Sequence, residues 1–414
     1  MELWKSMKLS LLPWGLAAAV LSQNALSTDM GNGLDIAGYF RGGPSVTQSG
    51  SQPRGHYSLG MDGDMWRLGN EGDLDANIRI RQTFNVGDGR QWSLGFRPAY
   101  NNPNGSLSDA GTYVTKEAYL ETSGYAFMPQ AKFWAGRRLL RDDVHAVDTF
   151  FIYLAGARQE SGAGVFDMPL GQGKLGLHAF RSDQIKEPTD NGQNATRLSA
   201  DFYDLPVNPG GKLRILGAFY SGHFKGGNQG FALTIKHDQT NFLLSGLNNS
   251  LWLQGSSGYG ALNTGFAAPG SLNGDLNAAT GTRALRLIDS LIWQRGRFGG
   301  QAMAEVEYDR KEQAGPSALG TSLGVRISYD FTDYVRLLSD GAMTTRVNSG
   351  GDTQRLNKLS IGLGLGPRPG YLSRPELRVY CTRLEWNDAA AAARTTLAGR
   401  NGTTLLGLQL ESWW

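Results

Sequence analysis

Cysteine and unbalanced charge are both scarce in this sequence. Cys381 is the single cysteine among 414 residues, which excludes an intramolecular disulfide and a cysteine-based zinc site. Lys and Arg total 40 against 37 for Asp and Glu, so the formal net charge is only +3. No Lys/Arg-rich run is present, and a nucleic-acid partner is therefore not expected.

Histidine is also rare, which limits metal binding. The five histidines of the sequence form no HxH or HxxxH pair. The stretch DDVHAVD, from Asp142 to Asp148, places carboxylates beside His145. A metal site is one possible interpretation of this stretch. We interpret it as a cluster of charge on a loop, and we expect neither a metal nor a cofactor.

Long apolar runs are missing beyond residue 30. Before that point, two lysines precede an apolar run from Leu9 to Leu21, and small residues follow it. This layout is typical of a secretory signal peptide, predicted here as residues 1–27. A membrane-anchoring helix is the alternative, but Pro13 and the short run disfavour it because a spanning helix needs about 20 apolar residues. No linker divides the remainder, so residues 28–414 are predicted to form one domain.

Alternation of polar and apolar residues is what the remaining sequence has in abundance. In the segment 74–86 apolar residues occupy most even positions, and in 323–331 they occupy the odd ones. Successive side chains of a strand point to opposite faces, so each segment is a predicted strand with one apolar and one polar face. We count about eighteen such segments between residues 34 and 414.

The environment of the apolar face decides between two all-β folds. A soluble sandwich buries that face, whereas an outer-membrane barrel turns it to lipid and lines its lumen with the polar face. The predicted strands approach the roughly 9–11 residues that a tilted membrane strand needs, and strands that are apolar on both faces are scarce. We therefore predict an antiparallel transmembrane β-barrel. Aromatic residues near strand ends fit its interfacial girdles: Trp92, Trp134, Phe298, Tyr329, Phe331, Trp386 and Trp414.

Two short motifs resemble catalytic or phosphate-binding loops. GTSLG at Gly320–Gly324 matches the GxSxG elbow, and GLGLG at Gly362–Gly366 looks like a glycine-rich phosphate loop. Both motifs need a helix after a strand, yet each lies inside an alternating strand with no helix behind it. We predict no catalytic residues and no enzymatic activity, and we expect these glycines to curve the strands or to thin the lumen wall.

The chain ends on Ser-Trp-Trp, and residue parity separates the two tryptophans. Trp414 shares its face with three leucines of the last predicted strand, whereas Trp413 shares its face with Gln409 and Glu411. Trp413 is therefore predicted to face the lumen and Trp414 to face lipid. The same argument places Tyr39 on the lumen face of the first strand.

Several stretches, in order along the chain, resemble the maltoporin (LamB-type) family of carbohydrate-selective porins. The resemblance covers nearly the whole chain beyond the predicted signal peptide. The stretches are GYFRGG from Gly38, WRLGNE (Trp66–Glu71), KEAYLE from Lys116, WAGRRLLRDDVHAVDTFF (Trp134–Phe151), LSRPELRVY (Leu372–Tyr380) and the terminal ESWW.

The resemblance implies an 18-stranded barrel with a pore-constricting inward loop, a homotrimer embedded in outer-membrane lipid, and passive uptake of maltose-type oligosaccharides. In such a pore a row of aromatic rings stacks on the sugar, and flanking charged groups exchange hydrogen bonds with its hydroxyls. The aromatic slide would include Tyr39, Phe150, Tyr371 and Trp413. The polar track would include Arg41, Arg67, Lys116, Arg141, Asp143 and Asp148, the last three of them forming the constriction on the inward loop.

Departures from the family pattern leave the preferred sugar open. Asp75 and Asn77 stand where the family has a slide tyrosine and a track glutamate, and Phe150 lacks the hydroxyl of the constriction tyrosine. Leu372 replaces a slide tryptophan, with Tyr371 beside it as a substitute. The aromatic row is therefore shorter than in the family.

Two alternatives stay open on the sequence alone. A general or differently specific porin for small hydrophilic solutes and ions would share the barrel, with Tyr39 and Trp413 as ordinary wall packing. A secreted all-β enzyme or sugar-binding protein would share the alternation but bury the apolar face of each strand.

Overall fold

The computed structural model describes residues 28–29, 31–49, 56–61, 63–102, 111–144, 147, 150–153, 161–183, 194–224, 227–258, 283–310 and 317–414. The predicted signal peptide lies outside these ranges and stays a prediction, as does the single domain over 28–414. Within the described ranges the one α-helix is α1 (Asp388–Ala393). None of the described residues forms a helix long and apolar enough to cross a membrane.

Eighteen long antiparallel strands form the wall of a closed barrel. They are β2 (Leu34–Gly42), β4 (Leu74–Asn85), β5 (Gln91–Asn102), β6 (Thr112–Tyr125), β7 (Met128–Arg137), β10 (Ser161–Leu170), β11 (Gly173–Asp183), β12 (Asn194–Asn208), β13 (Gly211–Phe224), β14 (Gly227–Gln239), β15 (Leu247–Gly258), β16 (Arg283–Arg295), β17 (Phe298–Arg310), β18 (Ala318–Asp330), β19 (Val335–Asn348), β20 (Gln354–Leu365), β21 (Glu376–Trp386) and β22 (Gly402–Trp413).

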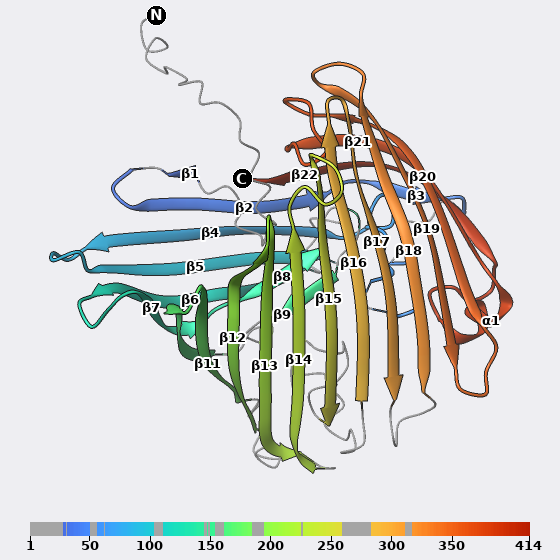
Figure 1. Cartoon of the computed structure of the whole chain (residues 1–414). Helices are drawn as coiled ribbons and strands as arrows, with labels where there is room; N and C mark the ends of the chain where they lie inside the picture. Colours follow the sequence, from blue (N-terminus) through green and yellow to red (C-terminus); the bar gives the residue numbers. More distant parts are fainter. Residues whose placement is uncertain are drawn as a thin grey trace, which may run out of the picture.

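The two ends of the described chain close this barrel. β2 pairs antiparallel with β22, with Tyr39 opposite Trp413 and Gly42 opposite Leu410, and the two strands lie side by side in Figure 1. The short β3 (Ser45–Thr47) continues along β22, and β1 (Thr28–Asp29) pairs with β2. The predicted 18-stranded antiparallel barrel is confirmed.

The apolar face of the strands points outward. In β22 the side chain of Leu406 is 57% exposed, whereas Gln409, on the other face, is 2% exposed. β20 repeats the pattern, with exposed Leu359 and Ile361 on either side of buried Ser360. A soluble sandwich would bury these leucines, so the orientation contradicts the secreted soluble alternative and fits a wall that faces lipid.

Two of the tryptophans predicted for the interfacial girdles face inward instead. Trp92 is exposed near a strand end, as predicted, but Trp134 and Trp386 are buried. The indole N–H of Trp134 donates to Nδ1 of His178 at 3.1 Å, and the ring of Trp386 stacks on Tyr57. The prediction relied on nearness to a strand end. Residue parity, however, decides which side of the wall a side chain occupies.

Trp414 lies on the outer side of the wall, opposite to Trp413. Its ring packs across Gly38 of β2 and leaves no room for a Cβ there. The two backbones exchange hydrogen bonds of 3.0 and 3.2 Å. The two terminal tryptophans therefore face opposite sides of the barrel, as parity predicts.

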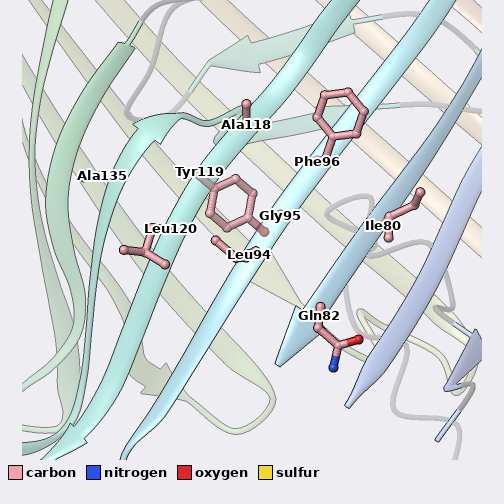
Figure 2. Close-up of a pocket in the computed structure, with 9 residues that line it drawn as sticks. All are labelled: Ile80, Gln82, Leu94, Gly95, Phe96, Ala118, Tyr119, Leu120 and Ala135. Atoms are coloured by element: carbon pink, nitrogen blue, oxygen red, sulfur yellow. The ribbon is translucent and has the colours of Figure 1, made fainter. Parts of the chain in front are cut away.

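Outward side chains over β4–β7 form a shallow apolar groove, shown in Figure 2. Ile80, Leu94 and Phe96 rise along it, and the small Ala118 and Ala135 leave it hollow. Ile80, Leu94 and Phe96 have the parity of the lipid-facing residues and are exposed. The groove therefore belongs to the outer surface of the wall and is separate from the lumen.

The connection between β21 and β22 contains a short helix. Asn387 begins α1 and accepts a hydrogen bond from the backbone N–H of Ala390 at 3.1 Å, as an N-cap residue does.

Candidate functional site

One stretch between β3 and β4 folds into the barrel lumen. Residues 56–61 and 63–73, called here the inward segment, run along the lumen side of β17–β22. The indole of Trp66 donates to the hydroxyl of Ser322 at 3.0 Å, and the carbonyl of Leu68 accepts from Ser360 at 2.8 Å. The glycine of the GTSLG motif at 324 lies against the Trp66 ring, where a Cβ would not fit. The motif is thus part of the lumen wall.

The predicted inward loop is also present. β8 (Arg141–Val144) and β9 (Phe150–Tyr153) pair with each other as a separate two-stranded sheet. This hairpin lies inside the ring of wall strands in Figure 1. Arg141, Asp143 and Phe150 lie on its two strands, whereas Asp148 lies outside the described residues.

The inward segment and the hairpin meet in the middle of the lumen. The backbone N–H of Arg67 donates to the carbonyl of Val147 at 3.2 Å. Apolar side chains surround this contact, although the lumen face of the wall strands was expected to be polar. The residues of this apolar latch are Trp66 from the inward segment, Val144 and Val147 from the hairpin, and Leu216, Trp252, Ile288 and Met303 from the wall.

The base of the hairpin is fixed to the opposite part of the wall. The guanidinium of Arg138 lies 4.4 Å from the ring centroid of Tyr119 and 4.8 Å from that of Phe166. It also binds Glu121 at 2.5 Å, while Leu140 packs against buried Trp134. The hairpin is therefore held at its base and near its tip, and it narrows the lumen between them.

A network of buried ion pairs joins the inward segment to the barrel seam. Glu411 of β22 is fully buried and accepts from Arg374 at 2.9 Å, from Arg378 at 3.1 Å and from Arg67. Five basic and five acidic residues make up the network, so it is electrically balanced. They are Arg41, Arg67, Arg336, Arg374, Arg378, Glu71, Asp73, Asp330, Glu376 and Glu411.

Three predicted site residues come together in this network. The hydroxyl of Tyr39 donates to Glu411 at 3.0 Å and accepts from Arg67 at 2.7 Å and from Arg41 at 3.2 Å. Burial by itself would lower the pKa of Arg67, but the carboxylates of Glu411 and Glu71 raise that pKa well above the ordinary value of arginine. Arg67 is therefore permanently charged, and the phenol of Tyr39 lies between cations and a carboxylate.

Trp413 lies at the edge of the same network. The guanidinium of Arg374 is 4.1 Å from the centroid of the Trp413 ring, within the range of a cation–π interaction. Arg374 is held there by its two hydrogen bonds to Glu411, of 2.9 and 3.2 Å. The indole is partly exposed on the lumen side of the seam, whereas the side chain of Arg374 against it is only 3% exposed.

The side chains of two further predicted residues have other partners than Trp413. Tyr371, in the turn between β20 and β21, is buried, and its hydroxyl is 3.5 Å from Oε1 of Gln301. Burial raises the pKa of Tyr371 to about 12. Lys116 of β6 pairs with Asp75 at 3.3 Å.

The sequence analysis did not single out Arg374 and Glu376, although both lie in the quoted stretch LSRPELRVY.

Water reaches the side of the lumen along β4–β6. The side chain of Arg81 is 36% exposed and that of Lys116 is 25% exposed. On β18 and β20, by contrast, Arg326 and Lys358 are each 2% exposed and share Asp340. A solute path along β4–β6 is therefore lined by partly exposed charges.

A closed barrel with an apolar outer face, a polar lumen and an inward constriction is a porin of the bacterial outer membrane. The sequence model described as LamB porin matches residues 34–414, and the chain belongs to that family. Family and fold are those of a channel rather than an enzyme.

Individual relatives agree with this assignment. Maltoporin 1 of Klebsiella pneumoniae subsp. pneumoniae is 26% identical over 436 aligned residues, which cover 96% of this chain and 97% of that protein. The crystal structure of OccAB1 from Acinetobacter baumannii is similar with a TM-score of 0.53 at 10% identity, covering 95% of this chain and 99% of that one. The second comparison shows a shared fold alone.

Proposed function

We propose that this porin passes maltose- or maltodextrin-type oligosaccharides by diffusion, and that Trp413 contacts the sugar. The observation that carries the proposal is the partly exposed Trp413 indole next to Arg374, which Glu411 holds in place. A sugar offers apolar C–H faces to an aromatic ring, so the exposed part of the indole suits it. Arg374 is 3% exposed, and it positions the ring from the protein side. The relative Maltoporin 1 is named for the same substrate class, which supports the proposal.

A general or differently specific porin is the second candidate. The Tyr39 hydroxyl already has three partners in the ion-pair network. Asp75, at the position of a slide tyrosine in the family, pairs with Lys116. Both observations favour a shorter row of aromatic contacts, and with it a pore for small hydrophilic solutes and ions.

Single-channel current through the protein in a planar bilayer distinguishes these candidates. Maltotriose titrated into the chamber is expected to block the ion current in a saturable manner. The Trp413→Ala variant is expected to weaken that block about fivefold to tenfold, because a lost aromatic contact costs roughly 1 kcal/mol. Ion conductance should stay the same or rise.

A matched control is Trp92→Ala, which removes an outward tryptophan and should leave the block unchanged. A wild-type current that maltotriose does not affect would favour the general porin. Equal block in wild type and Trp413→Ala would remove Trp413 from the sugar path.

The proposal includes a homotrimer, which the family resemblance implies. The protein extracted in mild detergent is expected to migrate as a trimer on unheated gels and as a monomer after boiling. Mass measurement of the detergent complex checks the stoichiometry. A monomer in both measurements would overturn this part and leave the single-barrel pore intact.

A further inference from the structure

Arg79 brings an uncompensated positive charge to the water-accessible side of the lumen. It lies on β4 between Ile78 and Ile80, which are exposed on the outer face, so Arg79 has lumen parity. Its side chain is partly exposed. Among the residues that the structure describes, Arg79 has no ion pair and no hydrogen-bond partner.

The neighbours of Arg79 do not neutralise it. The ladder pairs Asn77 with Ala99 and Ile80 with Phe96, which places Arg97 of β5 across from Arg79. Arg97 already binds Asn77 at 2.8 Å and Glu117 at 3.6 Å. The side chain opposite Arg79 on its other flank is that of Ala37, which carries no charge.

The acids further along the same face are mostly occupied. Glu121 binds both Arg81 at 3.1 Å and Arg138 at 2.5 Å, and Asp35 lies opposite Arg81 in the ladder, one lumen-facing pair away from Arg79. Over β4–β6, the base of the hairpin and Asp35 of β2, with Arg41 assigned to the seam network, the described lumen charges of this strip comprise five cations and four carboxylates. They are Arg79, Arg81, Arg97, Lys116 and Arg138 against Asp35, Asp75, Glu117 and Glu121.

The chemistry of the guanidinium group decides which ligand this strip suits. A guanidinium offers paired N–H donors that match a carboxylate or a phosphate with two parallel hydrogen bonds. A neutral sugar hydroxyl offers no such match. The wall along β4–β6 therefore suits a solute that carries an acid group.

We propose that Arg79 binds the acid group of an anionic sugar, a uronate or a sugar phosphate, as it passes along β4–β6. The proposal rests on the proposed sugar path for the sugar part of the ligand, and on the unpaired charge of Arg79 for the acid part. It makes the pore prefer anions over cations and acidic sugars over their neutral counterparts.

The test compares wild-type protein with Arg79→Gln in planar bilayers. Reversal potential in a KCl gradient reports ion preference without any sugar present. Block of the current by D-glucuronate, by D-glucose 6-phosphate and by neutral D-glucose then reports ligand preference. Arg383→Gln is the matched control, because Arg383 is exposed, lies on the outer-facing parity of β21 and pairs with Glu385 at 3.1 Å.

The wild-type pore is expected to prefer anions over cations. It should also bind at least one acidic sugar about tenfold more tightly than D-glucose, because one hydrogen bond to a charged group contributes about that much affinity. Arg79→Gln should remove most of both preferences, and Arg383→Gln should remove neither. The two acidic sugars distinguish a carboxylate from a phosphate ligand. Equal block by acidic and neutral sugars, or an unchanged reversal potential in Arg79→Gln, would overturn the proposal, whereas maltotriose block tests the proposed function separately.

Discussion

Replacing Glu411 by glutamine is expected to destabilise the folded barrel by about 3–5 kcal/mol, the usual cost of removing one partner from a buried charge pair. Glu411 is fully buried and serves Arg67, Arg374 and Arg378 at once. Glutamine keeps the size of the side chain but removes the charge, so three guanidiniums lose a shared counter-ion. Equilibrium unfolding by urea in lipid vesicles measures the change.

Glu385→Gln is the control for this prediction. Glu385 belongs to the neighbouring β21 and pairs with Arg383, but both side chains are about half exposed or more, at 61% and 47%. Exposed pairs contribute little to stability, so this variant should unfold like the wild type. Equal unfolding curves for Glu411→Gln and Glu385→Gln would contradict the view that the network is structural.

Replacing Trp66 by alanine is expected to raise single-channel conductance severalfold and to make the current noisier. Trp66 is the part of the apolar latch contributed by the inward segment, and truncating a buried tryptophan costs about 3–5 kcal/mol. The hairpin contact at Val147 lies next to it. Loosening the latch should free both inward elements from the wall and widen the constriction.

Trp66→Phe separates packing from hydrogen bonding in this experiment. Phenylalanine keeps a ring in the latch and gives up only the 3.0 Å bond to Ser322, so its conductance should stay close to that of the wild type. A wild-type conductance in Trp66→Ala would mean that the ion-pair network alone holds the constriction in place.

The ion-pair network and the apolar latch shape different parts of the lumen. Near the seam, Arg67 and Glu71 bind the inward segment by charge, and this fixes the surroundings of Trp413. In the middle of the lumen, Trp66 and Val147 bind the hairpin by apolar packing. The side along β4–β6 carries partly exposed charges, and ion and solute selectivity is expected to respond to mutation there.

The sequence by itself determined the wall of this barrel. Strand periodicity is local: each residue faces the side opposite to its neighbour, so parity alone placed Tyr39 and Glu411 inside and Leu406 outside. The same rule separated Trp413 from Trp414. The resemblance carried by LSRPELRVY and ESWW added the family, which the match over residues 34–414 confirms.

Only the tertiary structure decided what fills the lumen. Arg67 and Glu411 are 344 positions apart, and Trp66 and Ser322 are 256 apart. No local period records such contacts, because they depend on how the barrel closes and on how far the inward segment reaches across it. The apolar latch shows the reason most directly: lumen parity predicts a polar side chain facing water, but Leu216 and Ile288 face another part of the protein, and burial against it favours apolar groups.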